Sequence, residues 1–201
     1  MNDKFFDLKK EKQARMINAG LRLFALNGYH HASTDDIVKE AHISKGLLFH
    51  YFGSKAGYYA FLYNYVNRYA ILEFSSMIRT SGQDFFTLQE QLLNAEASVM
   101  EQHPFLFLFL QSVRNEDDSE GLSALEEPER NIIDFIDNLV SNSTHSDYLR
   151  INDSAKLAQI IHYVKTELTR ELFIDHTTPV AEYKSRMSDY IDLLRHLASN
   201  M

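Results

Sequence analysis

Apolar residues along this chain recur at intervals of three and four positions, the spacing that places them on one face of an α-helix. In the first such segment, about residues 9–27, Ile17, Leu21 and Phe24 follow this spacing, and Gly28 comes next as a helix-ending residue. Gly and Pro, which interrupt helices, number only seven and three in 201 residues. The pattern therefore predicts an all-α protein.

About nine helices are expected, with Ser, Gly and Pro residues marking most of their ends. A short second helix follows Ser33 or Thr34, either of which can cap it, and a third begins after Ser44 and runs to about Phe52. The remaining helices are expected at about 54–78, 84–102, 104–115, 124–142, 154–174 and 181–199.

The chain is predicted to divide into a small N-terminal domain, 1–53, and a larger domain, 54–201, because 201 residues can enclose two hydrophobic cores. Two polar stretches of the larger domain, 115–121 and 141–146, carry no apolar periodicity and are predicted to be mobile loops.

Composition narrows the classes of protein that this chain can belong to. Hydrophobic residues make up 45% and charged residues 24%, as in an ordinary soluble fold. The absence of Cys excludes disulfides, thiolate zinc sites and cysteine nucleophiles. The N-terminus lacks a signal-peptide pattern, and no apolar run approaches the roughly 18 residues of a membrane span. A cytoplasmic location without membrane insertion is expected.

Charge is distributed unevenly along the chain, although the whole carries a net −8. Residues 1–55 contain nine Lys and Arg against six acidic residues, a net +3, while the remainder contains eleven against twenty-two, a net −11. A basic N-terminus on an acidic body is typical of a protein that binds nucleic acid through one domain only. Chance asymmetry of a solvated surface is the alternative.

Two very short helices joined by a turn of about three residues make 34–52 the most informative segment. Helices below about 12 residues are marginal in water, so these two must be packed as a unit against the first helix. Their expected apolar seam consists of Ile37, Ala41, Ile43, Leu48 and Phe52. This packing would leave an outward face, suited to the major groove of DNA, that carries Lys45, Gly46, Leu47, Phe49 and His50.

Residues 15–58 resemble the DNA-binding domain of the TetR family of transcriptional regulators. The residues that match the spacing of the family are Arg15, Ile17, Ala19, Leu23, Phe24, Gly28, Tyr29, Thr34, Ile37, Ala41, Ile43, Ser44, Lys45, Gly46, Leu48, His50, Tyr51, Phe52, Ser54 and Lys55. Three positions depart from the family pattern: His42 replaces a Gly in the turn, Phe49 replaces a Tyr, and Leu47 replaces a small or hydroxyl residue.

The resemblance implies a helix-turn-helix that reads DNA and a helical C-terminal domain that binds a ligand and forms a dimer. By this similarity Thr34 and Lys55 contact phosphates, and Lys45, His50 and Tyr51 also contact DNA. Together with the outward face, the predicted DNA-binding set is Thr34, Ser44, Lys45, Gly46, Leu47, Phe49, His50, Tyr51 and Lys55.

The C-terminal domain offers two further candidate sites. Aromatic residues and polar residues set within apolar patterns suggest a ligand pocket formed by Phe105, Phe107, Phe109, Gln111, Arg114, His162 and Tyr163, with plain core packing as the alternative. Apolar stripes on the last two helices suggest a four-helix dimer interface formed by Leu157, Ile161, Val164, Leu168, Leu172, Met187, Tyr190, Ile191 and Leu194.

The sequence therefore predicts a homodimeric transcriptional regulator, a repressor of a pseudo-palindromic DNA operator that is released by a small, largely apolar effector. No enzymatic activity, cofactor or metal is expected, because no metal-ligand, nucleophile or phosphate-loop pattern is present. The alternative is a helical ligand-binding or carrier protein without DNA binding. The basic N-terminus favours the regulator, since a carrier has no need to segregate its positive charge.

Overall fold

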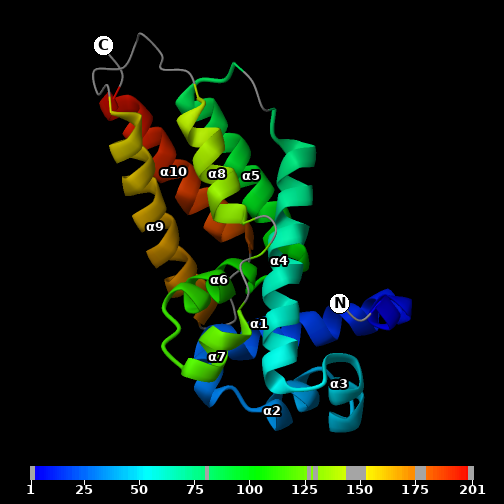
Figure 1. Cartoon of the computed structure of the whole chain (residues 1–201). Coiled ribbons are helices and arrows are strands. Elements are labelled where there is room, and N and C mark those ends of the chain that lie inside the picture. Colours follow the sequence, from blue (N-terminus) through cyan, green and yellow to red (C-terminus); the bar gives the residue numbers. More distant parts are fainter. Residues whose placement is uncertain are drawn as a thin grey trace. The chain divides into compact units, whose positions relative to one another are not determined.

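The computed structural model describes residues 3–79, 82–125, 128, 131–143, 153–174 and 180–198. These residues form an all-helical structure (Figure 1), which confirms the predicted fold class. No helix within the described ranges combines the length and apolarity that crossing a membrane requires. The chain forms two compact units: unit 1 comprises Met1–Asn67 and Gln102–Glu129, and unit 2 comprises Arg68–Glu101 and Arg130–Met201.

Unit 1 is built around α1, which packs against both α2 and α6. Its elements are the 3-10 helix η1 (Asp3–Asp7), α1 (Lys10–His31), α2 (Thr34–Glu40), α3 (Lys45–Phe52), the first part of α4 (Lys55–Met77), α6 (Leu106–Arg114) and α7 (Ser119–Ala124). Its core holds a cluster of contacting rings from α1, α4 and α6, which are Phe24, Tyr58, Tyr59 and Phe109.

Local signals explain the short helices. The Ser33 side chain accepts hydrogen bonds from the backbone N–H groups at the start of α2, and Ser44 accepts one from Leu47 N at 3.2 Å at the start of α3. Gly53 ends α3 at a φ of +74°. His42, which stands in the turn between α2 and α3 where the family has Gly, has a φ of +52°, in the left-handed region that favours Gly.

The predicted break after residue 27 is confirmed, since Gly28, with a φ of +66°, interrupts the helical geometry, and a second helical piece within the range of α1 runs to His31. One expectation about unit 1 is corrected. The stretch 115–121 is not a mobile loop: Asp118 accepts hydrogen bonds from Glu120 N and Gly121 N, both at 2.9 Å, and so begins α7.

Unit 2 contains the second part of α4, α5 (Phe85–Gln102, whose last residue is grouped with unit 1), α8 (Ile132–Ser141), α9 (Ser154–Ile174) and α10 (Val180–Ala198). Helices α9 and α10 lie side by side (Figure 1). The single helix predicted at 124–142 is wrong, because α7 ends at Ala124 and α8 begins at Ile132. Most of the loop predicted at 141–146 lies outside the described residues.

A buried ion pair joins three helices of unit 2. Lys165 Nζ on α9 lies 2.7 Å from Glu96 Oε1 on α5, with side-chain exposures of only 15% and 7%. The hydroxyl of Tyr183 on α10 donates to Glu96 Oε2 at 3.2 Å. The Lys165 ammonium and the Glu96 carboxylate have both lost most of their contact with water. Each needs the other, because either charge alone would be desolvated without compensation.

The predicted boundary between residues 53 and 54 does not coincide with the division into compact units. Unit 1 also takes in the first part of α4 together with α6 and α7, because α6 packs on α1. Compact units in the folded chain do not show which parts fold independently, so the domain boundary between residues 53 and 54 stays a prediction.

Candidate nucleic-acid interface

Helix α3 presents the outward face that the sequence predicts. Ser44, Lys45, Gly46 and His50 are exposed, while Leu48 is fully buried beneath them. A Cβ added at Gly46 would meet no atom within 4 Å, so the backbone here is open to a close approach by another molecule. The other members of the predicted DNA-binding set, Thr34, Leu47, Phe49, Tyr51 and Lys55, are half-buried.

A tight turn fixes α3 against the start of α4. A Cβ at Gly57 would lie 2.2 Å from the carbonyl oxygen of Phe52, a distance that no side chain can occupy. The Phe52 ring packs between the rings of Tyr58 and Phe61 at centroid distances of 4.8 and 4.7 Å. The turn and the ring contacts together set the direction in which α3 leaves the core.

Helix α1 holds the end of α2 through two arginines. Arg15 Nε donates to the carbonyl of Ala41 at 3.3 Å, and Arg22 pairs with Glu40 at 2.5 Å. The first of these bonds satisfies a carbonyl at the turn between the two short helices. The helix-turn-helix is thus attached to the core of unit 1 by polar contacts as well as by its apolar seam.

The N-terminal segment supports α3 from behind, a feature that the sequence reasoning missed. The fully buried ring of Phe5 on η1 contacts the rings of Tyr51 and Phe52 at centroid distances of 5.9 and 5.3 Å. Gln13 fastens η1 to α1 by donating to the carbonyls of Phe6 at 2.9 Å and Leu8 at 2.7 Å. The aromatic pair Phe5 and Phe6 ahead of the first helix is the signal that could have revealed this packing.

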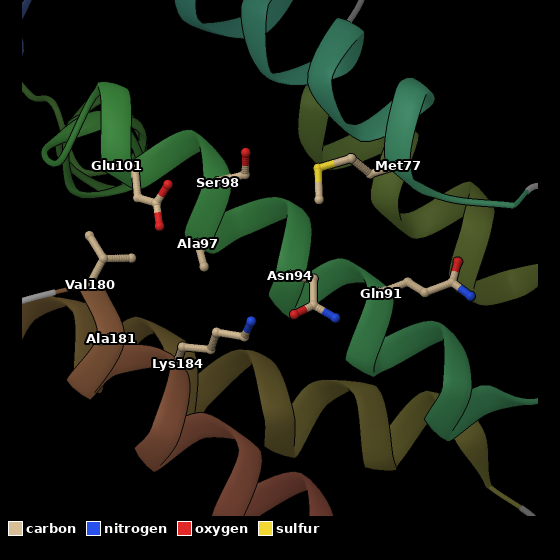
Figure 2. Close-up of a pocket in the computed structure, with 9 residues that line it drawn as sticks. All are labelled: Met77, Gln91, Asn94, Ala97, Ser98, Glu101, Val180, Ala181 and Lys184. Atoms are coloured by element: carbon tan, nitrogen blue, oxygen red, sulfur yellow. The ribbon is translucent and has the colours of Figure 1, made fainter.

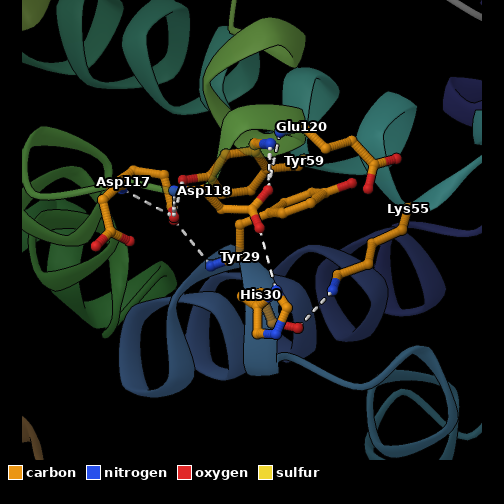
Figure 3. A network of polar contacts seen from close by, with 9 residues as sticks. Tyr29, His30, Lys55, Tyr59, Asp117, Asp118 and Glu120 are labelled. Carbon is orange, nitrogen blue, oxygen red and sulfur yellow. Dashed lines mark hydrogen bonds and ion pairs between the residues drawn. The ribbon is translucent and has the colours of Figure 1, made fainter.

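Both lysines predicted to contact DNA have partners within unit 1. Lys45 Nζ lies 2.9 Å from Asp35 Oδ1, in an ion pair whose side chains are largely exposed. Lys55 Nζ donates to the carbonyl of His30 at 3.2 Å and lies 4.5 Å from the centre of the Tyr29 ring (Figure 3). Their roles in DNA binding stay predictions.

Acidic side chains lie close to Tyr29, the residue whose ring contacts Lys55. Glu116 Oε2 accepts a hydrogen bond from Tyr29 N at 2.8 Å and one from the Tyr59 hydroxyl at 3.4 Å. Burial, followed by the neighbouring charge of Glu120, raises the pKa of the Tyr29 phenol to about 12. The phenol therefore stays neutral at any physiological pH, and its ring can support the Lys55 ammonium.

Unit 2 contains an open groove of about 640 Å³ between α4, α5 and α10 (Figure 2). Polar and apolar side chains share its lining, which consists of Met77, Gln91, Asn94, Ala97, Ser98, Glu101, Val180, Ala181 and Lys184. Its volume is suitable for a small molecule. In the described part of the chain, no three His, Asp or Glu side chains gather in a way that could hold a metal ion.

None of the seven predicted pocket residues lines this groove. Phe105, Phe107, Phe109, Gln111 and Arg114 belong to unit 1, where Phe109 is fully buried against Phe24 and Tyr59. His162 and Tyr163 lie in unit 2 and are exposed, Tyr163 by 61%. Their contact with a ligand stays a prediction.

Most of the predicted dimer interface is not exposed in the single chain. Six of its nine residues are buried there: Leu157, Ile161, Leu168, Leu172, Met187 and Ile191. Val164 and Leu194 are half-buried, and Tyr190 is exposed. The apolar residues that α9 and α10 do expose are Ile160, Tyr163, Tyr190, Leu193 and Leu197.

The geometry can be compared with known proteins. Residues 16–59, which span the helix-turn-helix, match the family model described as bacterial regulatory proteins, tetR family. The uncharacterized HTH-type transcriptional regulator YuxN of Bacillus subtilis (strain 168) is 35% identical over 104 residues, which are 50% of this chain. The match spans only 35% of the length of YuxN.

Solved structures match over most of the chain. A protein from Shewanella sp. PV-4 described as a tetR family transcription regulator is 25% identical, with a TM-score of 0.52 over 91% of this chain and 96% of the other. A transcriptional regulator from Saccharomonospora viridis, solved in complex with choline, has a TM-score of 0.61 over 96% of this chain and 100% of the other. At 16% identity, this second likeness concerns the fold alone.

Proposed function

We propose that this chain, whose residues 16–59 match the tetR family of bacterial regulatory proteins, is a transcriptional repressor. It binds a pseudo-palindromic operator as a homodimer and leaves the operator when a small effector binds. The observation that carries the proposal is the exposed face of α3, where Lys45, Gly46 and His50 stand outward on a helix anchored by buried Leu48. A helix held in this way can enter the major groove without rearranging its own core.

Dimerisation is proposed to use the exposed apolar residues of α9 and α10 rather than the stripe that the sequence singled out. Ile160 and Tyr163 follow helical spacing on α9, and Tyr190, Leu193 and Leu197 do so on α10. A second copy that lays the same two helices on these would form a four-helix contact with two-fold symmetry. Such symmetry would match the inverted repeat of an operator.

The groove of Figure 2 is the proposed effector site. Met77, Ala97 and Val180 offer contacts to the apolar part of a small molecule, while Asn94 and Lys184 offer a hydrogen bond and a positive charge to a polar group. The Saccharomonospora viridis regulator of the same fold was solved in complex with choline. An effector that combines an apolar part with polar groups suits the mixed lining of the groove.

In-vitro selection tests the proposed function. Purified chain is mixed with random DNA duplexes, and bound duplexes are amplified over several rounds. An enriched inverted repeat, with half-sites about one helical turn apart or a multiple of it, would support both DNA reading and the dimer. Failure to enrich any sequence would contradict the proposal and favour the carrier protein.

Gly46→Ala is expected to separate stability from DNA binding. An added methyl group meets only open space in the free protein, and Ala is the better helix former, so the free energy of unfolding should stay equal or rise by about 0.5 kcal/mol. If DNA backbone or bases approach this position closely, the same methyl group should weaken binding to the selected duplex about tenfold, or about 1.4 kcal/mol. Urea denaturation and fluorescence anisotropy measure the two quantities. Unchanged affinity would mean that Gly46 does not face DNA.

A further inference from the structure

The C-terminal end of α1 carries a histidine beside the lysine proposed to bind phosphate. The His30 side chain is 71% exposed, and its Nδ1 lies 3.1 Å from Asp118 Oδ2. The carbonyl of the same residue accepts the hydrogen bond from Lys55 Nζ (Figure 3). The His30 imidazole and the Lys55 ammonium therefore lie in the same region of the surface of unit 1. The Asp118 carboxylate already contacts the imidazole.

The Asp118 carboxylate is held firmly in this position. Its Oδ1 caps α7 through two backbone N–H groups, which leaves Oδ2 for His30. Glu116 fixes the preceding turn, since its Oε1 accepts from Asp118 N at 3.0 Å while its Oε2 accepts from Tyr29 N. The acidic segment is thus attached to the end of α1 at two points and presents a preformed negative charge to the imidazole.

We propose that His30 is a further DNA-contacting residue beside Lys55, and that Asp118 is its internal counter-ion, which a DNA phosphate has to displace. This inference rests on the proposed function, because it assumes that Lys55 meets the DNA backbone. It gives the acidic segment 116–120 a direct role in setting the strength of DNA binding.

The direction of the effect follows from charge. A phosphate that approaches His30 must replace the Asp118 carboxylate and then remain close to it, and both steps weaken binding. Removal of the negative charge at residue 118 should therefore strengthen binding, and it should do so through His30. Because a phosphate contact carries no base information, duplexes of every sequence should gain about equally.

Asp118→Asn is the main variant, since Asn caps a helix as well as Asp does and the start of α7 should persist. Asp117→Asn is the matched control: it removes the same charge one residue away, from an exposed side chain. His30→Gln is combined with each. Affinities for the selected duplex are measured at pH 6 and at several salt concentrations, and circular dichroism checks the helix content of every variant.

Asp118→Asn is expected to tighten binding about three- to fivefold for each DNA-binding unit, in line with an exposed ion pair, and to steepen the salt dependence by about one released ion per unit. Asp117→Asn should change affinity less than twofold, and in the His30→Gln background the two variants should behave alike. Equal effects of the two variants in the native background, a gain that persists without His30, or weaker binding by Asp118→Asn would each overturn the inference. If the unmodified chain binds no duplex, the proposed function itself has failed.

Discussion

Lys165→Met is expected to lower the free energy of unfolding by about 3 kcal/mol at pH 7. The substitution keeps the length of the side chain but leaves the Glu96 carboxylate buried, with the Tyr183 hydroxyl as its remaining partner in the network described above. A carboxylate buried without a cation has lost its hydration without compensation, and this uncompensated charge is the source of the loss.

Two further variants test whether the buried pair is the cause. Lys156→Met breaks the pair of Lys156, on α9, with Asp153, the residue just before this helix. The Lys156 side chain is 78% exposed, so the loss should be much smaller than that of Lys165→Met. The double variant Glu96→Gln with Lys165→Met removes both charges and should recover most of the stability. Urea denaturation followed by circular dichroism measures all three. Equal small losses for the two lysine variants would show that burial of the Lys165 pair has no energetic consequence.

The helix-turn-helix was predictable from the sequence because its determinants are local. Ser44 caps α3 through a bond three residues along the chain, Gly53 ends the helix two residues before α4, and the buried positions Ile37 and Leu48 follow the helical period. None of these features depends on a distant part of the chain. For this reason Lys45, Gly46 and His50 are exposed on α3, as the sequence predicts.

The interior of unit 2 was not predictable in the same way, because periodicity shows which residues share a face but not what covers that face. Leu157 and Ile161 are buried within the single chain, while Ile160 and Tyr163 on the same helix are exposed. Polar residues show the same ambiguity. The sequence singled out His162, which the structure exposes, whereas Lys165 on the same helix, with a side chain only 15% exposed, depends on a partner 69 residues away.

The segment 115–121 shows that composition can mislead about order. Its run of acidic and small residues is typical of a loop. The carboxylates of Glu116 and Asp118 nevertheless accept hydrogen bonds from backbone N–H groups, and these bonds hold the segment in place. The bond from Tyr29 N crosses 87 residues of sequence. It also explains why the chain remains ordered past the kink at Gly28, where sequence reasoning ended the first helix.

A second large effect is expected from His103, which lies between α5 and α6 and is buried in unit 1. Asn18 Nδ2 donates to the carbonyl of Gln102 at 3.0 Å, so its Oδ1 is left to accept from His103 Nδ1–H at 2.7 Å. The Tyr65 hydroxyl lies 3.1 Å from His103 Nε2 and can donate to it. These contacts suit a neutral ring with its proton on Nδ1, and burial lowers the pKa of His103 from 6.5 to about 4.

The folded protein is therefore expected to lose stability as the pH falls from 6.5 to 4. In this window the unfolded chain binds a proton at His103 that the folded chain does not, so protonation favours unfolding. Integrated over the window, the loss is about 3 kcal/mol. Above pH 6.5 the ring is neutral in both states, and this residue gives no pH dependence there.

His103→Gln isolates this contribution, because Gln can still donate to Asn18 but has no proton to gain. Its free energy of unfolding should depend on pH less steeply than that of the unmodified chain, by about 1.4 kcal/mol for each pH unit between 4.5 and 6. Carboxylates such as Asp84, whose pKa is lowered by hydrogen bonds from Thr87, also titrate at the acidic end, but they do so equally in both chains. His196→Gln, at an exposed position near the end of α10, is the control and should follow the unmodified chain. Urea titrations at half-unit pH steps give the curves, and parallel curves for His103→Gln and the unmodified chain would show that His103 takes up its proton without unfolding the protein.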